Sequence, residues 1–166
     1  ICARSGATGV RIARDEAERE LIWRARKAAF AAMGRLAPNY YVQDSVIPRT
    51  RLSEVLRRID ELAGEHELQV ANVFHAGDGN LHPLVLYDGA KEGEPERAEE
   101  LAGLIVKACV DAGGSITGEH GVGVDKKRYM PSMFSERDLS VFQRLRCAFD
   151  PEQRANPGKV MPTPRL

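Results

Sequence analysis

The sequence predicts an α+β fold, in which helices pack beside a mainly antiparallel sheet. Three observations support this prediction. Apolar residues recur at helical spacing in four segments, short runs rich in β-branched and aromatic residues lie between those segments, and an Asp-Gly pair joins two of the runs. The chain has 166 residues, of which 43% are hydrophobic and 29% are charged, and these values are ordinary for one globular domain.

The helices follow from the hydrophobic periodicity. Residues 16–36 are expected to form the first helix, because apolar side chains return on one face every three or four positions. Residues 51–64 show the clearest pattern of this kind. Residues 95–112 form a third helix that a Gly-Gly pair terminates, and residues 136–149 form a fourth that begins after a Ser-x-x-Asp capping box.

The expected strands are shorter than the helices. Residues 40–47 are predicted to form one strand and residues 115–117 another. Residues 68–74 and 84–87 lie on the two sides of the Asp-Gly pair and are predicted to form a β-hairpin. Pro83 has no N–H group to donate to a neighbouring strand, so we expect it at the edge of the sheet or at an irregular start of the second hairpin strand.

The hairpin brings together the residues with the clearest chemical meaning. A two-residue type I′ turn at Asp78 and Gly79 would place His75 directly opposite His82, with their Cβ atoms roughly 5 Å apart on one face of the sheet. Two imidazoles held in this way can share one divalent metal ion. A third ligand is available in Glu119, which lies in a glycine-flanked loop farther along the chain.

A set of two histidines and one carboxylate with open coordination positions is typical of catalytic zinc, and it also suits Mn or non-haem Fe(II). A substrate hydroxyl or carboxylate can then bind the ion directly. His120, next to Glu119, is not needed as a ligand and is available as a general base, because imidazole titrates near neutral pH. The alternative interpretation is structural: the glycines are ordinary turn residues, and the histidines contribute only to packing.

The overall composition excludes several kinds of partner. The formal net charge is zero and no basic stripe is present, so nucleic acid is not expected as a partner. No apolar run approaches the roughly 20 residues of a membrane span, so no transmembrane segment is expected. Cys2, Cys109 and Cys147 are odd in number and lack a CxxC spacing. Cys109 and Cys147 lie in helical patterns and are expected to be reduced. We therefore expect a cytoplasmic location, with peripheral attachment at the inner membrane as the alternative.

A series of short motifs runs in order along the chain from Trp23 to Pro162. It comprises residues 40–41, 44, 47–49, 70–80, 82–83, 113–116, 118–121, 148–151 and 156–159. The series resembles the C-terminal domain of FAD-linked 2-hydroxy-acid oxidases and dehydrogenases of the vanillyl-alcohol-oxidase type, and in particular of the members that oxidise glycolate. This resemblance implies that the α+β domain is the substrate or cap domain of such an enzyme and contains ferredoxin-like elements.

The resemblance also implies an incomplete enzyme. In the family a large N-terminal FAD-binding domain comes first, and residues 1–166 contain neither that domain nor a dinucleotide fingerprint or P-loop. FAD is therefore expected to be bound mainly by the missing domain, and the 166 residues alone are expected to be inactive. The expected partners are this FAD-binding domain, other oxidase subunits and a small 2-hydroxy-acid substrate.

The family pattern assigns roles to three further residues. Residues 23–27 resemble the family's Trp-x-x-Arg-Lys motif, whose arginine, here Arg26, holds the substrate carboxylate through two parallel hydrogen bonds. Without the resemblance, Arg26 would be an ordinary solvated charge on a helix. In relatives the tail segment returns to the flavin, which implies that Asn156 and Lys159 contact FAD.

The implied function is oxidation of glycolate, or a similar small 2-hydroxy acid, to the 2-oxo acid with hydride transfer to FAD. The predicted metal ion, Zn or Mn, would bind the substrate hydroxyl, and His120 would remove its proton. Members that act on 2-hydroxyglutarate carry a lysine where this chain has Val42, which favours a small monocarboxylate. Two alternatives stay open: an FAD-linked D-lactate dehydrogenase, and a metal-binding or interaction module without catalytic activity.

Overall fold

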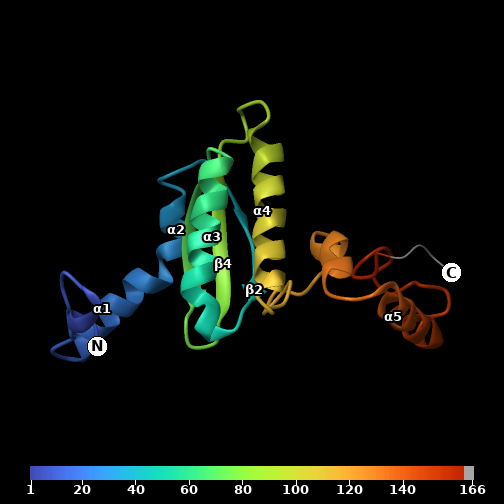
Figure 1. The fold of residues 1–166 in the computed structure, drawn as a ribbon, viewed down its shortest axis with the longest axis horizontal. Helices are drawn as coiled ribbons and strands as arrows, with labels where there is room; N and C mark the ends of the chain where they lie inside the picture. The colour runs from blue at the N-terminus through green and yellow to red at the C-terminus, as the bar shows by residue number, and fades with distance from the viewer. Residues whose placement is uncertain (163–166) are drawn as a thin grey trace.

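A four-stranded antiparallel sheet lies at the centre of the computed structural model, which describes residues 1–162 (Figure 1). The central strand is β4 (Asn80–Tyr87). β3 (Gln69–His75) pairs with one of its edges, and β1 (Asn39–Val42) and β2 (Ser45–Val46) pair with the other. Every strand pairing is antiparallel, so the predicted α+β fold with a mainly antiparallel sheet is confirmed.

Two long helices, α3 (Leu52–Glu65) and α4 (Glu94–Asp111), cover one face of the sheet (Figure 1). The apolar cluster that they bury against the sheet includes Ile47, Val55, Ile59, Leu62, Leu68, Leu81, Val85, Leu101, Ile105 and Cys109. On the opposite face, α2 (Ala29–Met33) packs against a smaller apolar cluster of β3 and β4. Because side chains alternate along a strand, Leu81 points into the larger core while His82 points to the face that α2 shares.

The first predicted helix is interrupted. The structure contains α1 (Glu16–Lys27) and α2 as separate helices, joined at Ala28, whose φ and ψ are −86° and 0°. The single helix predicted over residues 16–36 is therefore wrong. The break has a packing reason: α2 turns its apolar side chains onto the sheet, whereas α1 leads away from it, buries none of its side chains and leaves Trp23 56% exposed (Figure 1).

The strand predicted over residues 40–47 is present but divided into β1 and β2. The division lies opposite Pro83, which the strand register places against Gln43. The Gln43 N–H donates to the Pro83 carbonyl oxygen at 2.9 Å, but Pro83 has no N–H with which to return the bond. The expectation that Pro83 marks a sheet edge or an irregular strand start is wrong, because β4 is the central strand and continues through it.

The hairpin has a different register from the predicted one. His75 pairs with Asn80, and the partner of His82 is Val73. A type I′ turn requires positive φ at both central residues, but within the Asp-Gly pair only Gly79 has a positive φ, of 74°. The connection is instead a longer loop, in which two N–H groups donate to the His75 carbonyl oxygen at 3.0 Å. The two predicted ligands are therefore diagonal neighbours on one face of the sheet, and their predicted direct pairing is wrong.

The other helices have the predicted bounds to within one residue. α5 (Glu136–Phe149) begins after the predicted capping box, in which the Ser135 side chain accepts a hydrogen bond from the Asp138 N–H. A second apolar cluster joins α5 and the 3₁₀ helix η3 (Lys126–Ser132) to α4, and its buried members are Val106, Ile116, Met130 and Leu139. These parts lie beside the sheet and do not cover it (Figure 1).

The segment before the Glu119 loop forms less strand than predicted. Residues 115–117 contribute one bridge, in which the Ser115 N–H donates to the Val46 carbonyl oxygen at 2.8 Å and the Val46 N–H donates to that of Ser115 at 3.2 Å. This bridge anchors the start of the loop beside β2.

The 3₁₀ helices η1 (Ala3–Ser5), η2 (Arg49–Arg51) and η3 were not predicted, because such short helices carry little periodicity.

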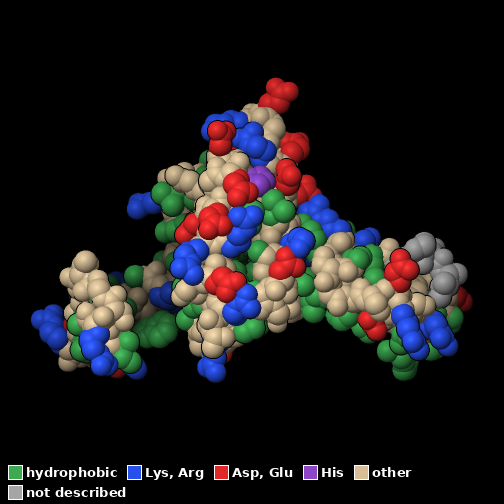
Figure 2. Space-filling model, in the orientation of Figure 1, with side chains coloured by type: hydrophobic (Ala, Val, Ile, Leu, Met, Phe, Trp, Pro, Cys, Tyr) green, Lys and Arg blue, Asp and Glu red, His purple; other side chains and the backbone are tan. Residues whose placement is uncertain are grey.

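Acidic and basic side chains are interspersed over α3 and α4 on the face seen in Figure 2. Some of them form ion pairs along α3: Arg58 lies 3.0 Å from Glu61 and 3.1 Å from Glu65. Within residues 1–162, no helix combines the length and the apolar character needed to cross a membrane.

Two glycine substitutions test the loop anchor. A Cβ atom at Gly114 would lie 2.0 Å from the Val46 carbonyl oxygen and 2.6 Å from that of Cys109. Gly114→Ala is therefore expected to lower the free energy of unfolding by about 1–3 kcal/mol. Gly64→Ala is the control: it adds a methyl group at an open position of α3 and should raise that free energy by about 0.5–1 kcal/mol. Urea unfolding measures both, and equal shifts in one direction would contradict the close packing at Gly114.

Candidate metal and substrate site

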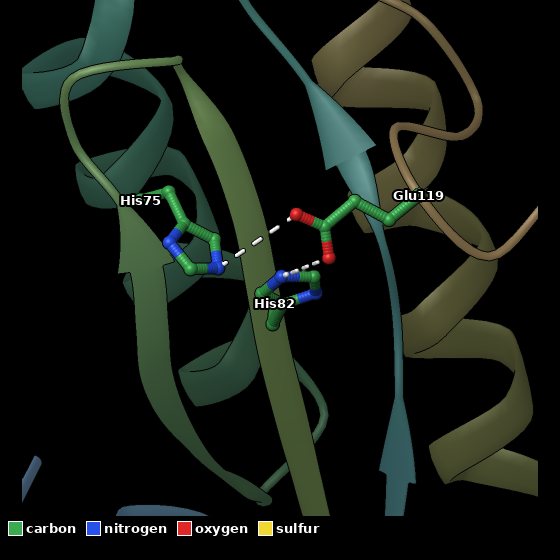
Figure 3. Close-up of side chains that lie close together, drawn as sticks. All are labelled: His75, His82 and Glu119. Atoms are coloured by element: carbon green, nitrogen blue, oxygen red, sulfur yellow. Dashed lines mark ion pairs between the residues drawn. The ribbon is translucent and has the colours of Figure 1, made fainter. Parts of the chain in front are cut away.

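Three side chains converge on the face of the sheet that α2 shares (Figure 3). His75 ends β3, His82 lies on β4, and Glu119 comes from the loop that follows the bridge to β2. The Glu119 carboxylate faces both histidines: Oε1 lies 3.8 Å from His75 Nε2, and Oε2 lies 3.6 Å from His82 Nε2. Ligand atoms from all three residues lie within 4.8 Å of one another, so the predicted metal ligands are brought together.

This arrangement fits a divalent metal ion. Two imidazole nitrogens and a carboxylate oxygen are donors that Zn²⁺ accepts, at distances of about 2.0–2.2 Å. Donor atoms around such an ion lie roughly 3.0–3.5 Å apart. The observed 3.6 and 3.8 Å belong to different oxygens of Glu119. One ligand atom from each of the three residues lies within 4.8 Å of the others, so side-chain shifts of about 1 Å would bring them around one ion. We call His75, His82 and Glu119 the ligand set. The side chains of His75 and Glu119 are 47% and 56% exposed, so one side of the ligand set is open to a further ligand.

His82 is the fixed member of the ligand set. Its side chain is 4% exposed, and its ring meets the ring of Phe30 edge-on, with 6.1 Å between the centroids. Burial lowers the pKa of His82, although the nearby charges of Asp44 and Glu119 oppose this shift. The neutral imidazole, which is the form that binds a metal, is therefore favoured.

His120 lies directly beside the ligand set. Its ring stacks on that of His82, with 5.3 Å between the centroids and 21° between the planes. The side chain is exposed, and it is not part of the group of metal-ligating residues found within residues 1–162. This position is compatible with the predicted role of His120 in proton transfer, because the ring lies against a predicted ligand without belonging to the ligand group itself.

Asp44, to which the sequence analysis assigns no role, organises the loop. It is fully buried, and its Oδ2 accepts hydrogen bonds from Thr117 Oγ1 at 2.8 Å and from the N–H groups of Gly118, Glu119 and His120 at 2.9, 3.0 and 2.9 Å. Burial by itself raises the pKa of Asp44, but these hydrogen bonds outweigh it and hold the pKa well below its usual range. The available signal was an acidic residue inside the strand predicted over residues 40–47, because a charge that becomes buried in a sheet requires partners.

Lys126 supplies a balancing charge from η3. Its side chain is 5% exposed, and its Nζ donates to the Asp44 carbonyl oxygen and lies 3.5 Å from Asp44 Oδ2. Burial lowers the pKa of Lys126, and the neighbouring Asp44 carboxylate opposes the shift. Because the two residues are 82 positions apart in the chain, no local pattern could have connected them.

Arg26 reaches the backbone of β3 beside the ligand set. Its Nη2 donates to the carbonyl oxygen of Phe74, the residue that precedes His75, at 3.4 Å. The Arg26 side chain is partly buried, whereas Arg24 and Lys27 on the same helix are exposed. The guanidinium group is therefore held next to one predicted ligand, where it can meet an anionic group.

The predicted FAD contacts, Asn156 and Lys159, are not part of the ligand set. Lys159 Nζ donates to Asn156 Oδ1 at 3.1 Å, and both residues are exposed. Arg146 of α5 orders this tail by donating to three of its carbonyl oxygens. The tail returns toward the site loop, because the Val160 N–H donates to the carbonyl oxygen of Gly123 at 2.7 Å.

Comparison with known proteins places the chain in a family. The profile of the family described as "FAD linked oxidases, C-terminal domain" matches residues 1–160. The chain belongs to this family. The resemblance seen in the sequence motifs is thereby confirmed.

Three relatives illustrate the range of the family. The chain is 51% identical over 163 residues to glycolate oxidase subunit GlcD of Escherichia coli K12, which covers 98% of the chain and 33% of that protein. It is 34% identical over 160 residues to GlcD of Bacillus subtilis, with coverage of 96% and 34%. It is 33% identical over 149 residues to the mitochondrial D-lactate dehydrogenase (cytochrome) of Arabidopsis thaliana, with coverage of 89% and 26%. The chain thus spans about a third of the length of the GlcD relatives.

The ligand set predicts a measurable metal content. Full-length protein purified without chelator is expected to contain about one divalent ion per chain, and His82→Ala is expected to lose most of it, because the buried ligand is removed. His66→Ala is the matched control, since His66 lies at the end of α3 with its Nδ1 2.8 Å from the Leu62 carbonyl oxygen. Elemental analysis measures all three proteins. Equal metal content in wild type and His82→Ala would show that these residues do not hold the ion.

Proposed function

We propose that these residues form the substrate-binding and metal-binding domain of a flavin-dependent 2-hydroxy-acid oxidoreductase, which oxidises glycolate or a similar small 2-hydroxy acid to the 2-oxo acid. The observation that carries the proposal is the convergence of His75, His82 and Glu119, with His120 stacked beside them, in a member of an FAD-linked oxidase family. The names of the two GlcD relatives support glycolate as the first substrate to test.

Two groups outside the chain complete the proposed reaction. When bound, FAD supplies the hydride acceptor, and a divalent ion, Zn²⁺ or Mn²⁺, supplies a Lewis acid for the substrate hydroxyl. We place FAD mainly in a separate N-terminal domain, since residues 1–166 correspond to about a third of the GlcD relatives. Asn156 and Lys159, in the tail that Arg146 orders, are the proposed contacts of this chain with FAD.

The residues of this chain bind the substrate and move its proton. Arg26, held at the end of β3, grips the substrate carboxylate through two parallel hydrogen bonds. The open side between His75 and Glu119 admits the 2-hydroxyl group. His120 accepts the hydroxyl proton on a ring nitrogen, and its packing against His82 keeps the imidazole at the edge of the ligand set.

D-lactate is the second candidate substrate. It shares the carboxylate and hydroxyl of glycolate and adds one methyl group, so Arg26 and His120 would serve both acids alike. The D-lactate dehydrogenase name of the Arabidopsis relative supports this candidate. One methyl group changes specificity by only about 1–3 kcal/mol, so the comparison requires kcat/KM values for both acids on the full-length protein.

A metal-binding module without catalysis is the remaining alternative. A purely structural metal site is closed by four protein ligands, whereas the set found within residues 1–162 has three and keeps one side exposed. This difference favours the enzyme. Assembly with other oxidase subunits is proposed from the subunit names of the relatives, and the cytoplasmic location stays a prediction of the sequence.

Replacing the adjacent Glu119 and His120 should give different results. In the full-length protein, His120→Ala is expected to keep its metal but to slow flavin reduction by glycolate roughly 10²–10⁴-fold, the usual contribution of a positioned general base. Glu119→Ala is expected to lose metal affinity, and with it substrate binding and turnover. Stopped-flow flavin reduction and metal analysis of each variant provide the two measurements.

The control for this pair is again His66→Ala, which should match wild type in both measurements. Loss of metal from His120→Ala would make His120 a ligand, and the proton acceptor would have to be another group. Flavin reduction at the wild-type rate in His120→Ala would disprove the proposed proton transfer.

Arg26 should control substrate affinity. Arg26→Ala removes a bidentate charged contact, so we expect KM for glycolate to rise about 10- to 100-fold while metal content stays unchanged. Arg24→Ala, an exposed change on the same helix, is the control and should leave KM near the wild-type value. Steady-state kinetics on the full-length protein decide the point: similar KM values for the two variants would remove Arg26 from the substrate site.

A further inference from the structure

We propose that Asp44 is the positioning residue of this site: its buried carboxylate fixes the backbone that carries Glu119 and His120 and orients His82 from behind. The inference rests on the proposed function, because it assigns Asp44 a purpose in holding the metal ligands and the base. In the metal-free protein, Asp44 already sets the loop geometry before any ion binds.

The Oδ2 atom of Asp44 accepts hydrogen bonds from the main chain of the loop that carries Glu119 and His120. Three consecutive N–H groups, of Gly118, Glu119 and His120, point at Oδ2 from 2.9, 3.0 and 2.9 Å. Successive N–H groups that converge in this way form a concave anion-binding arrangement, which here is filled by a side chain of the same protein. None of the three peptide groups can rotate without losing a charge-assisted hydrogen bond. The ligand and the base are therefore fixed through their main chain, although their own side chains are exposed.

Thr117 links both ends of the loop to Asp44 through its hydroxyl group. Its Oγ1 donates to Asp44 Oδ2 at 2.8 Å and accepts from the Gly121 N–H at 2.9 Å. The hydroxyl group thus connects the far end of the loop to the same carboxylate. Five consecutive residues, 117–121, depend on Asp44 directly or through Thr117.

The loop is also seated tightly on the sheet. A Cβ atom at Gly118 would lie 2.7 Å from Val46 Cγ2 and 2.8 Å from Asn80 Oδ1, so only glycine allows this approach. Val46 and Asn80 are paired residues of β2 and β4. The loop therefore rests on the two strands that also carry Asp44 and His82 into place, and a displacement of the loop would move Glu119 away from His82.

The Oδ1 atom of Asp44 faces His82 Nδ1, on the side of the ring away from Glu119. Asp44 Oδ1 lies 3.9 Å from His82 Nδ1, and neither of these buried atoms has a hydrogen-bond partner within residues 1–162. His82 directs its other nitrogen, Nε2, toward Glu119. A metal on Nε2 requires the proton on Nδ1, and a carboxylate facing that proton fixes the ring orientation and strengthens the ligand. A shift of less than about 1 Å would turn the contact into a hydrogen bond.

The position of Asp44 is itself well determined. The pairing of β1 and β2 with β4 sets it opposite His82 in a continuous register. Lys126 donates to its carbonyl oxygen and lies 3.5 Å from Oδ2, which balances the buried negative charge. A carboxylate held by the sheet on one side and by a buried lysine on the other can order an exposed loop without moving itself.

The test must separate positioning from general stabilisation of the fold. Asp44→Asn keeps the size of the side chain but removes its charge, and Thr117→Val removes one donor and the link to Gly121. Val55→Ala is the control, because Val55 lies on α3 and is buried in the apolar cluster between the helices and the sheet, which contains none of the site residues. All variants are made in the full-length protein.

The first measurement is amide hydrogen exchange in metal-free protein. In Asp44→Asn, the N–H groups of residues 118–120 are expected to exchange at least about tenfold faster relative to the amides of α3. Thr117→Val should show a smaller increase centred on Gly121, and Val55→Ala should show no selective increase in the loop. This readout depends neither on flavin nor on metal.

The second measurement is Zn²⁺ affinity by competition with a chelator. Loss of a residue that orients metal ligands typically weakens binding 10–100-fold, and we expect a change of this size in Asp44→Asn and a smaller one in Thr117→Val. Val55→Ala should bind Zn²⁺ like wild type. Unchanged exchange and unchanged Zn²⁺ affinity in both site variants would overturn the proposal, and so would equal changes in Val55→Ala, because the role would then be only structural.

The two hypotheses can fail separately. If wild type binds no Zn²⁺ or Mn²⁺, the proposed function is wrong, and hydrogen exchange still decides whether Asp44 orders the loop. If Asp44→Asn does not fold, Thr117→Val provides the same two measurements with a milder change. Protection of residues 118–121 equal to wild type in Thr117→Val would then count against Asp44 as the positioning residue.

Discussion

The pairing of β4 with strands on both of its edges is the constraint on which the rest of the structure depends. Its register decides which side chains enter the core under α3 and α4 and which emerge on the other face. Leu81 and Val85 fall on the core side, and His82 falls between them on the opposite side. A slip of one residue would exchange the two faces. The same strand pairing sets Asp44 opposite His82. The positions of His82 and of the Asp44 carboxylate behind it are therefore both determined by the register of β4.

Hydrophobic periodicity was sufficient for the long helices, because α3, α4 and α5 each repeat their pattern over several turns. It failed where tertiary contacts decide the outcome. Residues 16–36 have the composition of one helix, but only the α2 part has a sheet to pack against, and the chain bends at Ala28. Pro83 breaks a local rule for central strands, and the sheet accommodates it by interrupting the neighbouring strand opposite its missing N–H.

The ligand types could be read from the sequence, but their geometry could not. Histidines and a glutamate in glycine-flanked turns are unusual enough to be singled out, and His75, His82 and Glu119 do meet. Their direct pairing depended on a turn type that the dipeptide alone does not determine, and a longer loop made them diagonal neighbours. Asp44 contacts Thr117 and Lys126, which lie 73 and 82 positions away in the chain. The sequence next to Asp44 therefore could not indicate which loop it would contact.

The unequal burial of the three proposed metal ligands has a consequence for metal selectivity. The side chain of His82 is buried, with 4% of it exposed, whereas the exposed side chains of His75 and Glu119 have room to adjust to ions of different radius. Nitrogen and oxygen donors follow a common affinity order along the first-row divalent ions, so ligand type alone discriminates weakly between them. An ion bound by two exposed ligands would exchange with the bulk solution. The metal recovered with the protein would then be determined by the divalent ions of the growth medium as much as by the fold.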